Sequence, residues 1–400
     1  MRIAFLHSSN MGNVLHSFLG NDDSMKIAFD LRRIENPGVG RYMQCLVGAI
    51  VREAPQHEYF FIMSPGTRHM LDCTNQGIVL PLSARYYSIA EQVELPALLR
   101  KHRVDLFHAL HFVVPVIKVC PIVVSLLDTI HIVYPQDLPS WTGRQYARVM
   151  LNLAGRLADG IVTISEYSKS DIVRYLHIHP AKVTVTYAAV AEQFHAARST
   201  SEVERVQRGL QLPSGFLLYT GIYKKRKNHD GLLKAFASLL ASGVDTQLVI
   251  AGPINAGVDR LKESAAALGI GARVHFTGFV PEEDLPLLYA AASAYVCPSL
   301  YEGFGQTLVE AMACGTPVVS HNETSLPEVC GDAALYADAR NPEEFAAQLR
   351  RVLEDTELRS TLIERGYANV ARFSPQMVAR RTLQAYDKAL SGRVKRGNGR

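Results

Sequence analysis

The sequence has few cysteines and no pattern that would make them structural. None of its six cysteines stands in a C-x-x-C pair, and they are scattered over the chain. This spacing argues against a disulfide framework and against a structural zinc site. We therefore expect buried free thiols, as in a protein of a reducing compartment. The cysteines are Cys45, Cys73, Cys120, Cys297, Cys314 and Cys330.

Long apolar segments are missing as well. A membrane-spanning helix needs ~20 mostly apolar residues, whereas the longest apolar run, Val119 to Leu127, is interrupted by Pro121 and Ser125. The N-terminal segment contains Asn10 and Asn13 and lacks the apolar stretch of a signal peptide. We therefore expect a cytoplasmic protein.

Metal and nucleic-acid signatures are absent too. The sequence contains no D-x-D triplet and no histidine cluster with metal-ligand spacing, so no metal site is expected. A formal net charge of +4 over 400 residues is too weak to indicate a nucleic-acid-binding protein.

What the sequence does have is a regular alternation of short apolar runs and helical patterns. Fully apolar strands between amphipathic helices are typical of a parallel sheet covered on both faces, and a chain longer than ~300 residues normally forms more than one core. We expect strands at Lys26–Leu31, Tyr59–Met63, Leu106–Ala109, Ile122–Leu127, Gly160–Ile164, Val183–Thr186, Phe216–Thr220, Thr246–Gly252, Arg273–Phe276, Ala294–Cys297 and Pro317–Ser320.

The alternation stops over residues 188–213 and then starts again, which predicts two Rossmann-like α/β domains, 1–190 and 191–390. Residues 391–400 form a basic tail, of which we expect Arg393–Arg400 to be disordered. Met1-Arg-Ile-Ala-Phe is echoed by Met25-Lys-Ile-Ala-Phe. Residues 1–24 are therefore either an upstream extension, with Met25 as the true start, or an extra edge strand.

The parallel strands of the two predicted domains would present their carboxyl ends to a shared cleft, where ligands bind in folds of this kind.

The most informative segment runs from Pro298 to Pro317. Gly303 and Gly305 permit a tight turn after a strand, and a helix is expected over Gln306–Ala313. The free amides at the start of this helix suit an anion or sugar hydroxyls. Glu302 before the helix and Glu310 inside it offer carboxylates to a polyol.

This segment, E-G-F-G-Q-T-L-V-E followed by A-M-A-C-G-T-P, resembles the E-x7-E signature of retaining glycosyltransferases of family 4, which have the GT-B fold. The resemblance implies that Glu302 holds the donor sugar and that Glu310 holds the ribose of a nucleotide-diphosphate sugar. It also implies binding positions in the intervening turn and helix, namely Gly303, Phe304, Gly305 and Leu308.

Two other elements of the second domain fit the same donor site. Lys224-Lys-Arg-Lys227 follows a strand and resembles the family's G-x-x-x-x-R-K-N element, whose basic residues bind the donor diphosphate. This assigns Arg226 and Lys227 catalytic charge roles and makes Lys225 a binding candidate. The loop that contains Gly278 and Val280 corresponds to one that lies against the nucleotide base in relatives.

The first domain carries weaker elements. Gly38-Val-Gly40-Arg-Tyr resembles the opening of mannosyltransferase-like members, where it closes over the donor diphosphate. Asp128 ends an element that usually reads His-Asp, with Leu127 here in place of the histidine; Asp128 is a catalytic candidate, and nearby His131 could partly replace the missing side chain. The segment Ile164-Ser-Glu-Tyr-Ser-Lys-Ser-Asp171 is explained by a helix cap at Ser165 or Ser168.

The resemblance thus implies a metal-independent retaining glycosyltransferase without a cofactor other than its donor substrate, with GDP-mannose favoured. The acceptor would be a glycan or lipid-linked saccharide in cell-surface polysaccharide synthesis. Residues 85–103 mix aromatic, apolar and basic side chains, which fits either peripheral contact with the inner membrane or an ordinary amphipathic helix.

Two alternatives stay open at this point, and the sequence argues against two others. The donor could be a UDP-sugar, or, because of Leu127, the chain could be a binding partner without turnover. A sugar-nucleotide epimerase would not be expected to carry this E-x7-E segment. A nicotinamide oxidoreductase would need a third glycine after Gly38 and Gly40.

Overall fold

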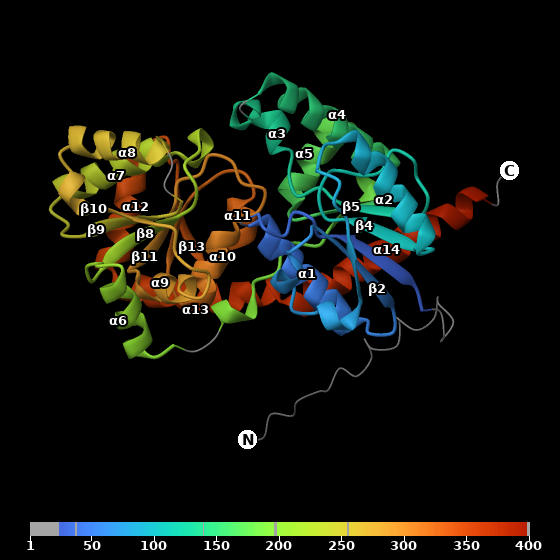
Figure 1. Cartoon of the computed structure of the whole chain (residues 1–400). Coiled ribbons are helices and arrows are strands. Elements are labelled where there is room, and N and C mark those ends of the chain that lie inside the picture. The colour runs from blue at the N-terminus through green and yellow to red at the C-terminus, as the bar shows by residue number, and fades with distance from the viewer. Residues whose placement is uncertain (1–23, 37, 139, 196–197, 254–255, 398–400) are drawn as a thin grey trace, which may run out of the picture.

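The computed structural model describes residues 24–36, 38–138, 140–195, 198–253 and 256–397. Within these ranges the chain forms two separate parallel sheets, which lie in two lobes side by side (Figure 1). This confirms the expected α/β architecture of two facing Rossmann-like domains. The segment 1–23, with its possible extension or edge strand, lies outside the described residues, as do 398–400.

The first sheet is buried on both faces by helices and has the strand order β3-β2-β1-β4-β5-β6-β7. Its central strands are almost entirely buried, because helices cover both faces of the sheet. The prediction missed only its edge strand β3, which is short and whose two end residues are exposed. The strands are β1 (Lys26–Asp30), β2 (Glu58–Met63), β3 (Ile78–Pro81), β4 (Leu106–Ala109), β5 (Ile122–Ser125), β6 (Gly160–Thr163) and β7 (Val183–Val185).

The second sheet has the order β10-β9-β8-β11-β12-β13. The edge strand β13 was also missed, because it is short and only its end residues are buried. The strands are β8 (Phe216–Thr220), β9 (Gln247–Ala251), β10 (Val274–Gly278), β11 (Ala294–Cys297), β12 (Val318–His321) and β13 (Ala334–Ala337).

The helices cover these sheets and cap their edges. The predicted helix over Gln306–Ala313 is confirmed to the residue as α10. The helices are α1 (Val39–Glu53), α2 (Ile89–Lys101), α3 (Ile130–Val133), α4 (Trp141–Leu157), α5 (Glu166–Leu176), α6 (Thr200–Gly209), α7 (His229–Ala241), α8 (Ala256–Ala267), α9 (Leu285–Ala291), α10 (Gln306–Ala313), α11 (Leu326–Cys330), α12 (Pro342–Glu354), α13 (Thr356–Val370) and α14 (Pro375–Gly397).

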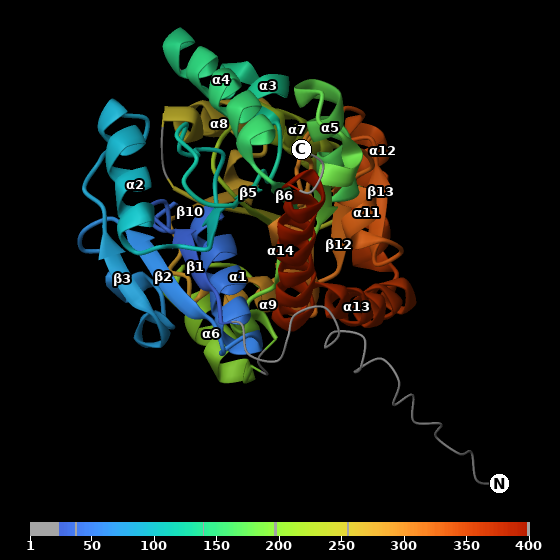
Figure 2. The ribbon, with the colours of Figure 1, turned by 90° about the vertical axis from the view of Figure 1, so that its right-hand side faces the viewer.

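The last helix, α14, returns to the first lobe and packs against α1 and β6 (Figure 2). Tyr386 of α14 lies 2.6 Å, hydroxyl oxygen to Nδ1, from His108 of β4, and Arg380 forms an ion pair with Glu53 of α1. By its contacts this helix therefore extends the first lobe. The expected disorder of Arg393–Arg400 was wrong for the described part of this segment, because α14 continues through Gly397.

Candidate functional site

The residues singled out in the sequence lie where the carboxyl ends of the two sheets meet. The loop after β11 leads into α10, and Gly305 caps that helix with a φ of 90°, which favours glycine. A side chain at Gly303 would come within 2.9 Å of the Cβ atom of Asp128 in the other lobe. Glycine at position 303 therefore lets the two lobes touch at this loop.

Glu302 is surrounded by the predicted basic turn. Lys227 Nζ forms an ion pair with Oε1 of Glu302, and Arg226 Nη1 lies 3.7 Å from Oε2. Burial alone would raise the pKa of Glu302, but the charges of Lys227 and Arg226 outweigh it and hold this pKa below its usual value. The turn and the carboxylate therefore form one charged cluster, as the resemblance implies for a donor site.

Arg226 also reaches the first lobe. Its Nε atom donates to Asp137 Oδ2 at 2.8 Å, and Lys224 Nζ donates to the Asp137 carbonyl oxygen at 3.1 Å. Lys225 begins the basic turn, but its side chain is exposed and takes part in none of the ion pairs found among the described residues. Asp137, which the sequence reasoning missed, thus holds two of the cations expected to meet a diphosphate.

Glu310 is fully buried, and Arg41 of α1 lies on its carboxylate. Arg41 Nη1 pairs with Glu310 Oε1, while Arg41 Nε donates to Glu282 Oε1 at 2.7 Å. The Tyr289 hydroxyl donates to Glu310 Oε2 at 3.2 Å. Burial raises the pKa of Glu310, and Arg41 opposes this rise. Arg41 was not among the predicted site residues, although its position in G-V-G-R-Y was the available signal.

The two glycines before Arg41 differ in what they require. A Cβ atom at Gly40 would lie 1.9 Å from the Ile34 carbonyl oxygen, so only glycine fits there. Gly38 precedes the helix with a φ of 79° and open space around it. Together they bring the first turn of α1, and with it Arg41, up to the second lobe.

Asp128 lies behind the Gly303 loop. Its Oδ1 atom accepts from the Ile130 amide at 2.9 Å. Burial raises the pKa of Asp128, while the Ile130 hydrogen bond and the charge of Arg226 oppose the rise. Burial also lowers the pKa of His131, so its imidazole is neutral near pH 7. Asp128 therefore lies beside the candidate donor site as a carboxyl group that is partly buried.

The predicted helix cap at Ser165 is confirmed for α5, and the same residue also contacts the second lobe. Ser165 Oγ accepts from the Ser168 amide at 2.9 Å. The hydroxyls of Ser165 and Ser168 both donate to the Gly303 carbonyl oxygen, at 2.6 and 3.0 Å. The first lobe thus fixes the loop that carries Glu302.

Most of the remaining predicted binding residues have side chains in the core. Phe304, Leu308 and Val280 have buried side chains that belong to the core. The Leu308 amide is bonded to the Gly305 carbonyl at 3.0 Å. Gly278 has a φ of 74° and lines a small cavity beside Tyr223.

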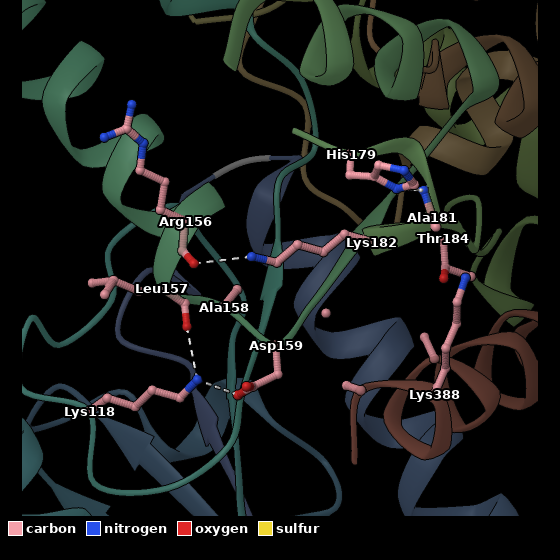
Figure 3. Close-up of a pocket in the computed structure, with 13 residues that line it drawn as sticks. Lys118, Arg156, Leu157, Ala158, Asp159, His179, Ala181, Lys182, Thr184 and Lys388 are labelled. Carbon is pink, nitrogen blue, oxygen red and sulfur yellow. Dashed lines mark hydrogen bonds and ion pairs between the residues drawn. The ribbon is translucent and has the colours of Figure 1, made fainter. Parts of the chain in front are cut away.

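A cavity of about 410 Å³ lies away from this cleft, between β6, β7 and α14 (Figure 3). Its Lys118 and Lys182 already donate to the last carbonyl oxygens of α4, at Leu157 (3.0 Å) and Gly155 (2.7 Å). These lysines are thus explained as caps of α4. In the part of the chain that the structure describes, no group of three or more His, Cys, Asp or Glu side chains is arranged to hold a metal ion.

Comparison with known proteins agrees with this geometry. A family model described as Glycosyl transferases group 1 matches residues 200–369, and one described as Glycosyltransferase Family 4 matches residues 38–194. The chain is 32% identical over 384 residues to O-antigen chain mannosyltransferase B of Escherichia coli, covering 90% of this chain and 99% of that protein.

Two further likenesses are more distant. D-inositol 3-phosphate glycosyltransferase of Salinispora arenicola is 32% identical over 250 residues, which cover 58% of this chain and 56% of that protein. The crystal structure of Anabaena Alr3699/HepE in complex with UDP-glucose superimposes with a TM-score of 0.74 at 21% identity, over 92% of this chain and all (100%) of that chain, and so supports the fold. With a relative matched over nearly its whole length and both lobes matched by family models, the chain belongs to the family 4 glycosyltransferases and is an enzyme of the GT-B fold.

Proposed function

We propose that this chain is a retaining, metal-independent mannosyltransferase that moves mannose from GDP-mannose to a glycan or lipid-linked saccharide in cell-surface polysaccharide synthesis. The observation that carries the proposal is the convergence of Lys227 and Arg226 on Glu302 at the end of β11. The preference for mannose is supported by the similarity to the mannosyltransferase of Escherichia coli.

In the proposed complex the donor diphosphate lies over Arg226 and Lys227. It takes the place of the Asp137 carboxylate on Arg226, and the ribose hydroxyls take the place of Arg41 on Glu310. Both exchanges replace one charge-assisted contact by another, so Arg226 and Glu310 stay paired, and Arg41 keeps its contact with Glu282. Glu302 then accepts hydrogen bonds from hydroxyls of the donor sugar.

In the proposed reaction the bond between mannose C1 and the departing phosphate oxygen breaks, while C1 bonds to the acceptor hydroxyl oxygen on the same face. The hydroxyl proton passes to the departing diphosphate, so no protein base is required. GDP and the mannosylated acceptor are the products. Arg226 and Lys227 stabilise the charge that develops on the diphosphate, which is an electrostatic contribution to catalysis.

Peripheral membrane contact is part of the proposal. Within residues 85–103, Leu95 and Leu99 are buried in the core and do not belong to an exposed apolar surface. Other apolar side chains around α2 are exposed. They lie instead on the start of α2, on the neighbouring loop and on α4. Their exposed fractions are 86% for Ile89, 65% for Val93, 50% for Val116, 62% for Ile117, 69% for Trp141 and 56% for Val149.

Such a set of exposed apolar groups suits the surface of a bilayer. The loop at Val116 is tied to α2, because its amide donates to Gln92 Oε1 at 2.8 Å. Basic side chains at Arg100 and Lys101 end the same helix. No helix within the described ranges is long and apolar enough to cross a membrane.

Calorimetric titration of the full chain with GDP, UDP, ADP, dTDP and their sugar conjugates tests the donor. Binding of GDP and GDP-mannose, with the other bases at least about tenfold weaker, is the expected result. Binding of uridine nucleotides instead would replace the proposed donor, and binding of none would remove the proposed activity.

A further inference from the structure

Helix α5 of the first lobe begins against the second lobe. Its first two amides, those of Glu166 and Tyr167, donate to the two carboxylate oxygens of Glu328 in α11, at 2.7 and 3.0 Å. A carboxylate in this place satisfies amides that have no partner inside the helix, and it lies at the positive end of the helix dipole. The start of α5 is therefore docked on the second lobe, beside the Gly303 loop.

Tyr301, the residue before Glu302, extends from the second lobe into the first. It is only 2% exposed. Its ring lies against the rings of Tyr134, which follows α3, and of Tyr167 in α5, with centroids 5.5 and 5.9 Å apart. Its hydroxyl donates to Asp171 Oδ2 of α5 at 2.7 Å. Tyr301 is thus a side chain of one lobe that is buried among residues of the other.

The hydrogen bond between Tyr301 and Asp171 is shielded from solvent. Asp171 is 6% exposed, and its Oδ2 atom also accepts from the Thr129 hydroxyl at 3.4 Å. Burial raises the pKa of Asp171, and the two hydrogen bonds oppose this rise because they favour the charged form. A hydrogen bond to a buried carboxylate is stronger than one between neutral groups, so it can hold the Tyr301 side chain in one place.

The main chain of Tyr301 reaches the charged cluster of the candidate donor site. Its carbonyl oxygen accepts from Arg226 Nη1 at 3.2 Å, and the amide of Leu300 donates to the Arg226 carbonyl oxygen at 2.8 Å. Tyr301 is followed directly by Glu302, whose carboxylate pairs with Lys227. A shift of Tyr301 would therefore move both Arg226 and Glu302, and a misplacement of ~1 Å in an active site can cost ~10²-fold in rate.

We propose that Tyr301 and Asp171 are positioning residues for sugar transfer. The first lobe holds the Tyr301 hydroxyl through Asp171, and Tyr301 in turn holds Arg226 and Glu302 in the geometry that the reaction needs. This inference rests on the proposed function, because it assigns a role in the same reaction. Removal of the hydroxyl leaves Arg226 and Glu302 present but less firmly placed, so the effect falls on kcat more than on nucleotide affinity.

Four variants test the hydrogen bond. Tyr301→Phe keeps the ring and loses the hydroxyl, and Asp171→Ala loses the acceptor. Asp171→Asn keeps an oxygen that can accept from the Tyr301 hydroxyl, and the fourth protein combines Tyr301→Phe with Asp171→Ala. Tyr336→Phe is the matched control, because it also loses a hydroxyl hydrogen bond, to the Gly331 carbonyl oxygen at 2.6 Å, in β13 of the second lobe. The kcat and KM for transfer from GDP-mannose to an α-mannobioside are measured, and calorimetry gives the dissociation constant for GDP.

We expect kcat to fall about tenfold in Tyr301→Phe and in Asp171→Ala, with KM for GDP-mannose and the dissociation constant for GDP within about twofold of the wild type. Asp171→Asn should recover most of the lost rate. The double variant should be no slower than the slower single variant, because both substitutions remove the same hydrogen bond. Tyr336→Phe should turn over as the wild type does.

The inference is overturned if Tyr301→Phe keeps the kcat of the wild type, if Tyr336→Phe loses as much, or if the loss falls on nucleotide binding alone. It is also overturned if the two single losses multiply in the double variant, since the residues would then act independently. A wild type that transfers no sugar would contradict the proposed function and this inference with it. A normal wild-type rate beside an unaffected Tyr301→Phe contradicts the inference alone, so the two failures are distinguishable.

Discussion

Arg41 of the first lobe forms an ion pair with the fully buried carboxylate of Glu310 in the second lobe. The contact joins residues 269 positions apart in the sequence and covers the carboxylate expected to hold the donor ribose. The buried charge of Glu310 is thus neutralised by a side chain from the opposite domain. Asp137 does the same for Arg226.

Replacing Arg41 tests how much its ion pair with Glu310 stabilises the fold. Arg41→Ala leaves Glu310 buried without its cation, and we expect the free energy of unfolding at pH 7 to fall by about 3 kcal/mol. The pKa of Glu310 is already raised by burial, so the loss should shrink as the pH falls and the carboxyl group becomes neutral. Urea unfolding at pH 7 and pH 5 measures both effects.

Arg52→Ala on the same helix is the matched control, because Arg52 is exposed and lies 3.8 Å from exposed Glu192. It should cost less than about 1 kcal/mol. Equal losses of unfolding free energy in Arg41→Ala and Arg52→Ala would show that the buried ion pair stabilises the fold no more than an exposed one does.

Asp137→Asn is expected to strengthen nucleotide binding. The carboxylate of Asp137 competes with the donor diphosphate for Arg226 at 2.8 Å, and the amide competes less because it carries no charge. We predict a dissociation constant for GDP lower by about tenfold, or ~1.4 kcal/mol, in a calorimetric titration. Asp245→Asn, which loses an exposed pair with Arg273, should leave the value unchanged. Weaker binding by Asp137→Asn would mean that Asp137 supports the site instead of competing for it.

The buried histidine of β4 predicts a pH dependence of stability. Burial lowers the pKa of His108 from 6.5 to about 3. The unfolded chain therefore takes up a proton on this residue at a higher pH than the folded chain does, and the stability that His108 contributes above pH 6.5 is lost as the pH falls. Between pH 7 and 4.5 this loss is about 2–3 kcal/mol.

His108→Gln removes the titrating group and keeps partners for Ser125 and Tyr386, which lie 2.9 and 2.6 Å from the imidazole. The stability advantage of the wild type over this variant should therefore narrow by about the same 2–3 kcal/mol between pH 7 and 4.5. His69→Gln at an exposed position controls for general acid effects. A pH-independent difference would contradict the assignment of a neutral, buried imidazole.

Membrane contact is tested by removing the two most accessible apolar groups of α2. Ile89→Ser combined with Val93→Ser should weaken binding to vesicles of anionic phospholipid by about tenfold or more, since each side chain would lose its apolar contact with the bilayer. Sedimentation with the vesicles measures this. Leu268→Ser, at a 39% exposed position in the other lobe, is the control. Unchanged sedimentation of the double variant would place the membrane face elsewhere or remove it.

Much of the fold was predictable because local signals and tertiary structure agree. Gly303, Gly305 and Gly315 bracket α10, and Pro317 follows it, so both its ends could be read from the sequence. The central strands were predictable because both their faces are buried. The edge strands β3 and β13 were not, because short, partly exposed strands carry a weak pattern.

The contacts between the two lobes could not be predicted from local sequence patterns. Asp137 lies in a short turn, and nothing around it in the sequence indicates that it meets Arg226, 89 positions away. The return of α14 to the first lobe is likewise a product of tertiary packing with α1. By contrast, the E-x7-E spacing and the basic turn already indicated one site, and Lys227 and Glu302 form an ion pair there.

The central claim is that Lys227 and Glu302 belong to a centre that transfers a sugar from a nucleotide diphosphate. The most direct measurement is the rate of mannose transfer from radiolabelled GDP-mannose to an α-mannobioside, by the wild type, Lys227→Ala and the exposed-lysine control Lys234→Ala. We predict a mannosylated product with retained configuration, a rate lower by about 10²–10³ in Lys227→Ala, and a control rate equal to that of the wild type. Equal rates in all three proteins, or no transfer by a wild type that binds GDP-mannose, would contradict the account.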